Sequence, residues 1–248
     1  MHNAAFAALG MADEWRYVAL PVPAELFEET VRGLPASGYR GANVTIPHKL
    51  LALAVADEGT AAARGAGAAN TLTFSGDGAI QADNTDTGGL VDALGDVPAT
   101  ALVLGAGGAA RGAVWGLRQA GVRVAVWNRT ADRAAVLAGE LGVDAVDTVV
   151  PDGYDAVVNT TSIGLDPKLS DASALAALGL EGSAPPPLVV DMVYRGGGDA
   201  TPLAGWAAGG GSRFVDGLEI LVRQGARSFE TWTGKRPPLD VMRQAARS

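Results

Sequence analysis

The sequence predicts an α/β protein of two domains, the second of which is a doubly wound parallel sheet. From about residue 99, short apolar runs alternate with helical segments. Strands that are apolar on both faces are typical of a parallel sheet covered by helices. Residues 1–98 mix short strands and helices less regularly, and residues 220–248 return to a helical pattern with one apolar face. The predicted domains are therefore 1–98 with 220–248, and 99–219.

The first domain is expected to begin with short elements. A strand at residues 17–20, a helix near 25–33 and a strand at 42–45 follow from their apolar and β-branched patterns. Residues 70–74 and 79–82 flank the sequence Ser-Gly-Asp-Gly, which is typical of a β hairpin.

The second domain has a regular series of expected elements. They are strands at 101–104, 122–127, 143–146, 156–159, 188–191 and 213–215, and helices at about 110–120 and 131–141. The glycine runs at 196–198 and 209–211 show no periodicity and are expected to be loops. The tail predicts a helix whose apolar or small face should pack back on the first domain; this face contains Leu218, Leu221, Val222, Gly225, Phe229 and Trp232.

Composition excludes several classes of function. The 248 residues contain no cysteine and two histidines, which argues against disulfides, thiolate catalysis and a structural zinc site. The net charge of −8 argues against nucleic-acid binding. No apolar run approaches the ~20 residues of a membrane span. Residues 1–4 lack the basic region of a signal peptide. Together, these observations lead us to expect a cytoplasmic protein that binds neither membrane nor metal.

A glycine-rich turn predicts a dinucleotide site. The run Gly105-Ala106-Gly107-Gly108-Ala109-Ala110 follows an apolar strand and opens a helix. Gly105 permits the tight turn, Gly107 lets the backbone approach a pyrophosphate, and Ala110 allows the helix to pack closely on the strand. The free N–H groups and the positive dipole of the helix N-terminus then face the phosphates.

The end of the next strand favours NADP over NAD. NAD sites usually place Asp or Glu there, on the ribose 2′-hydroxyl. This chain instead has Asn128, Arg129 and Thr130, followed one turn later by Arg133. Arg129 can pair with a 2′-phosphate, and its two neighbours can bond to that group without repelling it. An exposed arginine with no ligand is the alternative interpretation.

The segment Asn43-Val44-Thr45-Ile46-Pro47-His48-Lys49 delivers one lysine to a fixed point after a strand. Together with further motifs it resembles shikimate dehydrogenase, and the resemblance runs nearly from end to end. The other motifs are Gly67-Ala68-Ala69-Asn70-Thr71, Asp83-Asn84-Thr85-Asp86, the glycine turn, Asn128-Arg129-Thr130, Asn159-Thr160-Thr161-Ser162-Ile163-Gly164, Asp216-Gly217-Leu218-Glu219 and Gln224-Gly225-Ala226.

The resemblance implies NADP-dependent interconversion of shikimate and 3-dehydroshikimate. It implies that Lys49 is the acid/base and that Asp86 binds the substrate beside it. It further implies substrate contacts by Thr45, Asn70, Gln224 and Tyr194, and cofactor contacts by Gly105–Ala109, Asn128–Thr130, Arg133, Thr161, Met192 and Gly217.

The chemistry of these residue types agrees with the resemblance. An alcohol that loses a hydride must also lose a proton, which a lysine can accept when desolvation or a nearby cation favours its neutral form. The adjacent Asp86 is expected to orient Lys49 and the hydroxyl. The loop at Arg195 and residues 196–198 is looser than is usual in the family, which leaves the placement of Tyr194 open.

Members of the family usually begin with a strand and a Ser-x-Ser segment that binds the substrate carboxylate, followed by His-Asn. Here His2 and Asn3 stand at that point, so the sequence given starts after the two serines. Without them, the loss of two hydrogen bonds to a charged group would weaken substrate binding by about 3–6 kcal/mol. An edge of the first sheet would also be exposed.

Two alternatives stay open: a weak or silent NADP-binding relative, and a dehydrogenase for quinate or another polyol acid. The chain is expected to be a monomer or a homodimer.

Overall fold

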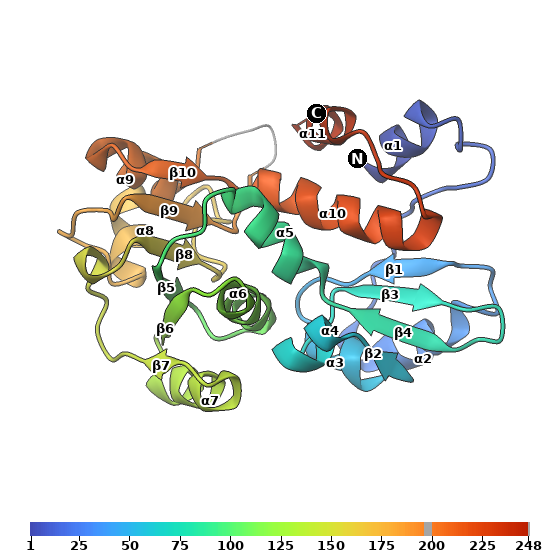
Figure 1. Cartoon of the computed structure of the whole chain (residues 1–248), viewed down its shortest axis with the longest axis horizontal. Helices are drawn as coiled ribbons and strands as arrows, with labels where there is room; N and C mark the ends of the chain where they lie inside the picture. Colours follow the sequence, from blue (N-terminus) through green and yellow to red (C-terminus); the bar gives the residue numbers. More distant parts are fainter. Residues whose placement is uncertain (196–199, 248) are drawn as a thin grey trace.

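The computed structural model describes residues 1–195 and 200–247. Two sheets, each with its own helices, lie at opposite ends of an elongated molecule (Figure 1). Helices α5 (Thr85–Leu94) and α10 (Gly217–Thr233) pack against each other between the two sheets (Figure 1). No helix in the described part of the chain is both long and apolar enough to cross a membrane. The predicted fold class is confirmed, whereas the exact domain boundaries stay a prediction.

The smaller sheet has the strand order β1-β3-β4-β2. The β3–β4 hairpin is confirmed, with the turn between them closed by a 3.0 Å bond from Ser75 N to Ala79 O. The side chains of Phe27, Val31 and Leu72 belong to the apolar cluster under this sheet. The strands are β1 (Gly41–Asn43), β2 (Glu58–Gly59), β3 (Thr71–Phe74) and β4 (Ile80–Asp83), and the helices are η1 (Ala24–Leu26), α2 (Phe27–Gly33), α3 (Lys49–Ala54) and α4 (Ala61–Ala66).

The strand expected at residues 17–20 is wrong. That segment is irregular, with Val18 and Leu20 43% and 46% exposed. The side chain of Asn3 bonds to both the N–H and the C=O of Tyr17, at 2.7 and 2.9 Å. A strand requires a neighbouring backbone to pair with. Here the side chain of Asn3 occupies the backbone groups of Tyr17. Residues 17–20 do not pair with the sheet, since its edge strand β1 has β3 as its single strand neighbour.

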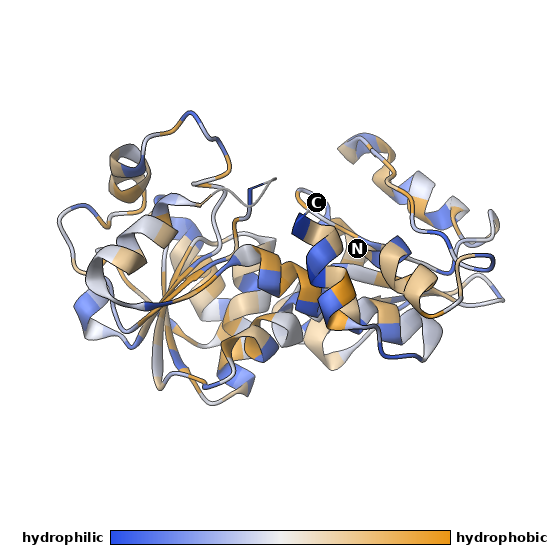
Figure 2. Cartoon of the chain, turned by 90° about the horizontal axis from the view of Figure 1, so that it is seen from above, coloured by the Kyte–Doolittle hydropathy of each residue, from blue (hydrophilic) through white to orange (hydrophobic). Residues whose placement is uncertain are grey.

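The larger sheet is entirely parallel, in the order β10-β9-β8-β5-β6-β7. Its strands are largely apolar and are coloured orange in Figure 2. They are β5 (Thr100–Leu104), β6 (Arg123–Trp127), β7 (Asp144–Ala145), β8 (Ala156–Asn159), β9 (Leu188–Asp191) and β10 (Arg213–Val215). The helices around it are α6 (Gly108–Gln119), α7 (Ala131–Leu141), η2 (Pro151–Gly153), α8 (Asp171–Ala177) and α9 (Pro202–Gly210). The strand order reverses beside β5, and ligands of such sheets bind at the carboxyl ends there.

The loop expected at residues 209–211 is wrong. Gly209 and Gly210 continue α9, and Gly211 ends it in a left-handed conformation with φ +70°. Buried Leu203 and Ala207 hold the helix on the sheet, which outweighs the low helix propensity of its glycines. The other glycine loop, 196–198, lies outside the described residues.

The tail helix packs back on the first sheet, as predicted. Val222 and Phe229 of α10 are fully buried in a cluster with Phe6 of α1 (His2–Ala8) and with Met242 of α11 (Leu239–Arg247). Trp232 Nε1 donates to Leu72 O of β3 at 3.0 Å. The chain therefore crosses between the two sheets twice. It enters the larger sheet at the amino end of β5 and leaves it at the carboxyl end of β10.

Candidate active site

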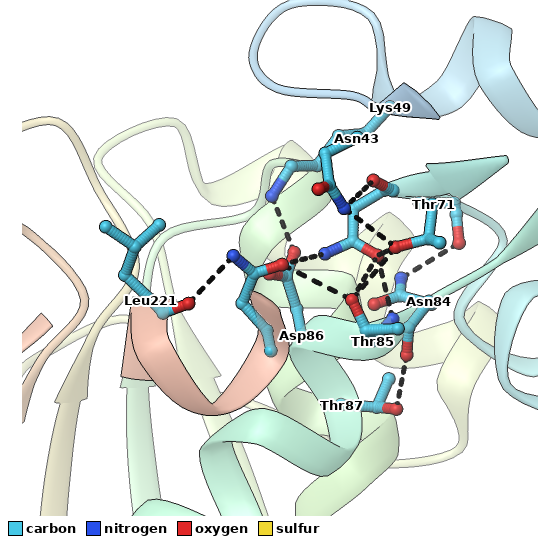
Figure 3. A network of polar contacts seen from close by, with 11 residues as sticks. Asn43, Lys49, Thr71, Asn84, Thr85, Asp86, Thr87 and Leu221 are labelled. Carbon is cyan, nitrogen blue, oxygen red and sulfur yellow. Dashed lines mark hydrogen bonds and ion pairs between the residues drawn. The ribbon is translucent and has the colours of Figure 1, made fainter. Parts of the chain in front are cut away.

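Lys49 and Asp86 form a shielded ion pair. Lys49 opens α3 and Asp86 lies in the first turn of α5, where the helix dipole favours a carboxylate. Lys49 Nζ donates to Asp86 Oδ2 at 2.6 Å, and the two side chains are 12% and 8% exposed (Figure 3). The two predicted catalytic residues therefore come together, within reach of solvent.

A buried amide network lies next to this pair (Figure 3). Asn70 Nδ2 donates to Gln224 Oε1 at 3.3 Å, which joins residues 154 positions apart. Asn70 Oδ1 accepts from the backbone N–H of Thr85 at 2.7 Å, and Gln224 Nε2 donates to Leu221 O at 3.0 Å. Both predicted amide residues therefore have hydrogen-bond partners within the protein that fix their orientation.

Two hydroxyls that were not predicted as site residues complete the network. Thr85 Oγ1 lies 3.1 Å from Asn70 Oδ1, 3.3 Å from Gln224 Oε1 and 3.0 Å from Thr71 Oγ1. Thr71 and Thr85 are 0% and 3% exposed. Thr71 follows Asn70 and Thr85 precedes Asp86 in the sequence motifs. This adjacency is the one feature of the sequence that could have indicated them as site residues.

Tyr194 and Thr45 lie at the open side of the site. Tyr194 is 44% exposed and Thr45 is exposed. Burial raises the pKa of Tyr17, and the nearby Tyr194 raises this pKa further. Tyr17 donates from its hydroxyl to Asn43 Oδ1 at 3.1 Å, and Asn43 Nδ2 donates to Thr71 Oγ1 at 3.2 Å. A polar path thus runs from the network toward the neighbourhood of Tyr194.

The glycine turn is tight and leads directly into the uncapped start of α6. Gly105 has φ +115°, and a Cβ there would lie 2.6 Å from Thr160 Oγ1, so that only glycine fits. Gly107 precedes α6, and a Cβ built on it meets nothing within 4 Å. No side chain caps the N-terminus of α6, so its first N–H groups can bind an anion. Ala110 is fully buried, as the predicted close packing of helix on strand requires.

The residues that were predicted to select NADP line one hollow of about 180 Å³, together with Thr161. Asn128 Nδ2 donates to Thr130 O at 2.9 Å, which fixes the loop. Arg129 and Arg133 are exposed, and neither forms an ion pair within residues 1–195 and 200–247. Arg129 follows the end of β6 and Arg133 lies in the first turn of α7. Exposed guanidinium groups of this kind pair well with a phosphate, so both stay candidates for the 2′-phosphate of NADP.

Asp191 anchors the segment that carries Met192. Its buried carboxylate accepts from Asn159 Nδ2 at 2.9 Å, Thr201 Oγ1 at 2.6 Å and Val193 N at 3.1 Å. Burial raises the pKa of Asp191 to about 6, although these hydrogen bonds act in the opposite direction.

Gly217 brings the start of α10 against the same segment. A Cβ on Gly217 would lie 2.5 Å from Val193 O and 2.7 Å from Met192 O. Met192 and Gly217, which were both predicted to line the cofactor site, are therefore neighbours at the carboxyl end of β9. No group of three or more His, Asp or Glu side chains able to hold a metal occurs in the described part of the chain.

The lysine pair and the glycine turn meet at Gly108. A Cβ on Gly108 would lie 3.1 Å from Lys49 Cβ, so the first residue of α6 touches the lysine side chain. The hollow at Arg129 lies along the sheet, at the ends of β6 and β8. The amide network, the Lys49–Asp86 pair and the glycine turn therefore lie next to one another. The hollow at Arg129 lies farther along the sheet.

Comparison with known proteins places this site in a family. The family model of the shikimate dehydrogenase substrate binding domain matches residues 1–72, and that of the shikimate 5′-dehydrogenase C-terminal domain matches residues 217–247. The shikimate dehydrogenase (NADP(+)) of Methanocella arvoryzae is 40% identical, with 100% of this chain and 92% of that protein covered.

Solved structures agree with the sequence matches. Shikimate 5-dehydrogenase from Thermus thermophilus, in complex with NADP(H) and shikimate, superposes with a TM-score of 0.85 at 36% identity. The match covers 99% of this chain and 92% of that one. The 5-ketofructose reductase of a Gluconobacter strain superposes with a TM-score of 0.82 at 28% identity, and covers 99% and 91%. On its motifs, its fold and these matches, the chain belongs to the shikimate dehydrogenase family.

Proposed function

We propose that this protein is an NADP-dependent oxidoreductase that interconverts shikimate and 3-dehydroshikimate in aromatic amino-acid biosynthesis. The observation that carries the proposal is the contact between the Lys49 side chain and Gly108 at the start of the dinucleotide helix. It puts a proton-transferring group beside the glycine turn, as the oxidation of an alcohol by a nicotinamide cofactor requires.

Each residue of the site has a proposed task. Lys49 accepts the proton of the reacting hydroxyl during oxidation and returns it during reduction, and Asp86 orients both groups through its 2.6 Å bond to Lys49. Asn70 and Gln224 hold the ring hydroxyls, because their amides are already fixed against each other. Thr45 and Tyr194 bind the exposed edge of the substrate. The ring carbon is left as a carbonyl once the carbon–hydrogen bond has given up its hydride.

The cofactor site is formed by this chain's own backbone and cations. NADP, when bound, accepts or supplies the hydride. The turn Gly105–Ala109 holds the pyrophosphate through free N–H groups, and Arg129 and Arg133 hold the 2′-phosphate with help from Asn128 and Thr130. Thr161, Met192 and Gly217 line the remaining path toward the nicotinamide.

We further propose that residues 1–98 with 220–248 form the substrate domain and residues 99–219 the NADP domain. The buried cluster that joins α1, α10 and α11 supports assigning the tail to the first domain. The enzyme acts in the cytoplasm on small molecules, as a monomer or a homodimer.

The proposal is tested by following nicotinamide absorbance with shikimate and NADP, and then with NAD. We expect turnover with NADP and a strong preference for it over NAD. A chain extended upstream by the family's strand and Ser-x-Ser segment, assayed in parallel, shows how much those serines contribute. If neither form turns over shikimate while both bind NADP, the proposal fails in favour of a silent relative.

A second candidate function is reduction or oxidation of a different polyol. The likeness to a 5-ketofructose reductase favours it, together with the exposure of Thr45 and Tyr194 at the substrate edge. Assays with quinate and with 5-ketofructose decide between the candidates. Faster turnover of either compound than of shikimate would make that compound the better substrate.

A further inference from the structure

One face of helix α6 consists of three glycines four residues apart. Gly108, Gly112 and Gly116 share this face because an α-helix has 3.6 residues per turn. The face packs against the first domain, where α6 contacts both α4 and α5. Gly112 and Gly116 are buried, and the proposed catalytic machinery does not include them.

The three glycines meet three residues around Asp86. A Cβ on Gly108 would lie 3.1 Å from Lys49 Cβ, and one on Gly112 would lie 3.1 Å from Asn84 Oδ1 and 3.5 Å from Asp86 Cβ. A Cβ on Gly116 would lie 2.7 Å from the backbone oxygen of Thr87 and 3.1 Å from its Cα. The glycine face therefore lies directly on the turn of α5 that carries Asp86.

The same helix begins at the dinucleotide turn. Its N-terminus follows Gly107, so the position of α6 sets the position of a bound pyrophosphate. Its glycine face sets how close α5 can approach. One rigid element thus determines the separation between the Lys49–Asp86 pair and the cofactor.

We propose that Gly112 and Gly116 are positioning residues that fix the distance between the Lys49–Asp86 pair and the bound nicotinamide cofactor. This inference rests on the proposed dehydrogenase function. Since the partner of Gly116 is backbone, an added methyl group must push the two helices apart. Since the partner of Gly112 is a side-chain amide, an added methyl group requires a shift of a few tenths of an ångström.

The matched test compares Gly116→Ala with Gly139→Ala. Gly139 lies in α7 of the same domain, is exposed, and would meet nothing within 4 Å. For Gly116→Ala we expect kcat with shikimate to fall by about tenfold or more, because small misplacements slow a positioned reaction strongly. We expect the Kd for NADP, from quenching of tryptophan fluorescence, to stay within about twofold, since the turn itself is intact. Gly139→Ala should leave both quantities unchanged.

An isotope effect separates positioning from simple loss of stability. Shikimate that carries deuterium on the reacting carbon should show a larger isotope effect on kcat in Gly116→Ala, because hydride transfer becomes slower than the other steps. Gly112→Ala should show the same changes to a smaller degree, and it takes over the test if Gly116→Ala does not fold. Unchanged kcat and isotope effect per folded molecule in both variants would overturn the proposal.

A distance measurement without substrate keeps this inference separate from the proposed function. The chain has no cysteine, so spin labels can be placed cleanly at Gly76→Cys in the hairpin and Val136→Cys on α7. Val136 is 58% exposed, and Gly76 has open space around it. We expect a longer label distance in the Gly116→Ala background than in the Gly139→Ala background. Equal distances would contradict the spacing role even if shikimate proved to be the wrong substrate.

Discussion

Lys49 Nζ lies 2.6 Å from Asp86 Oδ2, and the start of α6 closes over the lysine side chain at Gly108. The two charged residues come from different helices, α3 and α5, and both are largely shielded from water. Such a pair keeps its geometry because neither charge can turn away without losing its partner. The resulting fixed geometry is what an acid/base residue at a reacting hydroxyl requires.

Replacement of the lysine should affect turnover more than binding. For Lys49→Ala we expect kcat to fall by about 10²–10⁴-fold, since general acid–base catalysis typically contributes this much, with a much smaller change in KM. Steady-state assays with shikimate and NADP measure both constants. Lys235→Ala, in an exposed segment, is the control and should behave like the parent protein. A variant that loses affinity alone would make Lys49 a binding residue.

Removal of Arg129 should change the choice of cofactor. In Arg129→Ala we expect kcat/KM for NADP to fall by about 10–100-fold, which corresponds to the loss of one or two charge-assisted hydrogen bonds. The value for NAD should change little, because NAD lacks the 2′-phosphate. Arg123→Ala, at the opposite end of β6, serves as the control. An equal loss with both cofactors would assign Arg129 to folding or to another phosphate.

The threonine inside the amide network should influence substrate affinity. Thr85→Val keeps the shape of the side chain but removes the hydroxyl that lies 3.1 Å from Asn70 Oδ1 and 3.3 Å from Gln224 Oε1. We expect KM for shikimate to rise by about tenfold, since a lost buried hydrogen bond costs about 1–3 kcal/mol, while the Kd for NADP stays the same. In Thr231→Val, on the exposed side of α10, KM should not change. If KM is also unchanged in Thr85→Val, the amides are held without its hydroxyl.

Most of the larger sheet could be predicted from the sequence because its strands are short apolar runs separated by helices. Residues 156–159 and 188–191 were predicted with the bounds that β8 and β9 have. The strand at residues 17–20 was wrong because pairing decides whether an apolar segment becomes a strand, and the side chain of Asn3 bonds to the backbone there. The loop expected at residues 209–211 was wrong because packing of α9 against the sheet outweighs the weak helix propensity of glycine.

The site was predictable in its residues and less so in its contacts. The resemblance named Asn70 and Gln224, but a bond between residues 154 positions apart depends on how α10 returns to the first sheet. The close packing at Gly112 and Gly116 could not be predicted from the sequence, because it depends on which residues of the neighbouring helix lie against them. The hydroxyls of Thr71 and Thr85 had only their adjacency to Asn70 and Asp86 as a signal, and their contact depends on how β3 and α5 meet.

The buried Asp191 should lower the free energy of unfolding as the pH rises. Its pKa is about 6 in the folded protein and 3.8 for the unperturbed group, so between these values the folded chain holds a proton that the unfolded chain has lost. Stability from this group is therefore highest below about pH 4 and falls as the pH rises through about 6. The loss amounts to about 3 kcal/mol, and Arg195 moderates it by favouring the carboxylate.

Asp191→Asn removes this titration while it keeps most of the local bonds. The amide oxygen can still accept from Asn159 Nδ2 and Val193 N, and the amide nitrogen can donate to Thr201 Oγ1 once that hydroxyl turns. Urea unfolding of both proteins at several pH values gives the difference in free energy of unfolding, in which the other titrating groups cancel. We expect this difference to shift in favour of Asp191→Asn by up to about 3 kcal/mol between about pH 4 and pH 7. A constant difference would mean that Asp191 titrates alike in both states, and that the bonds around Met192 hold the charge without cost.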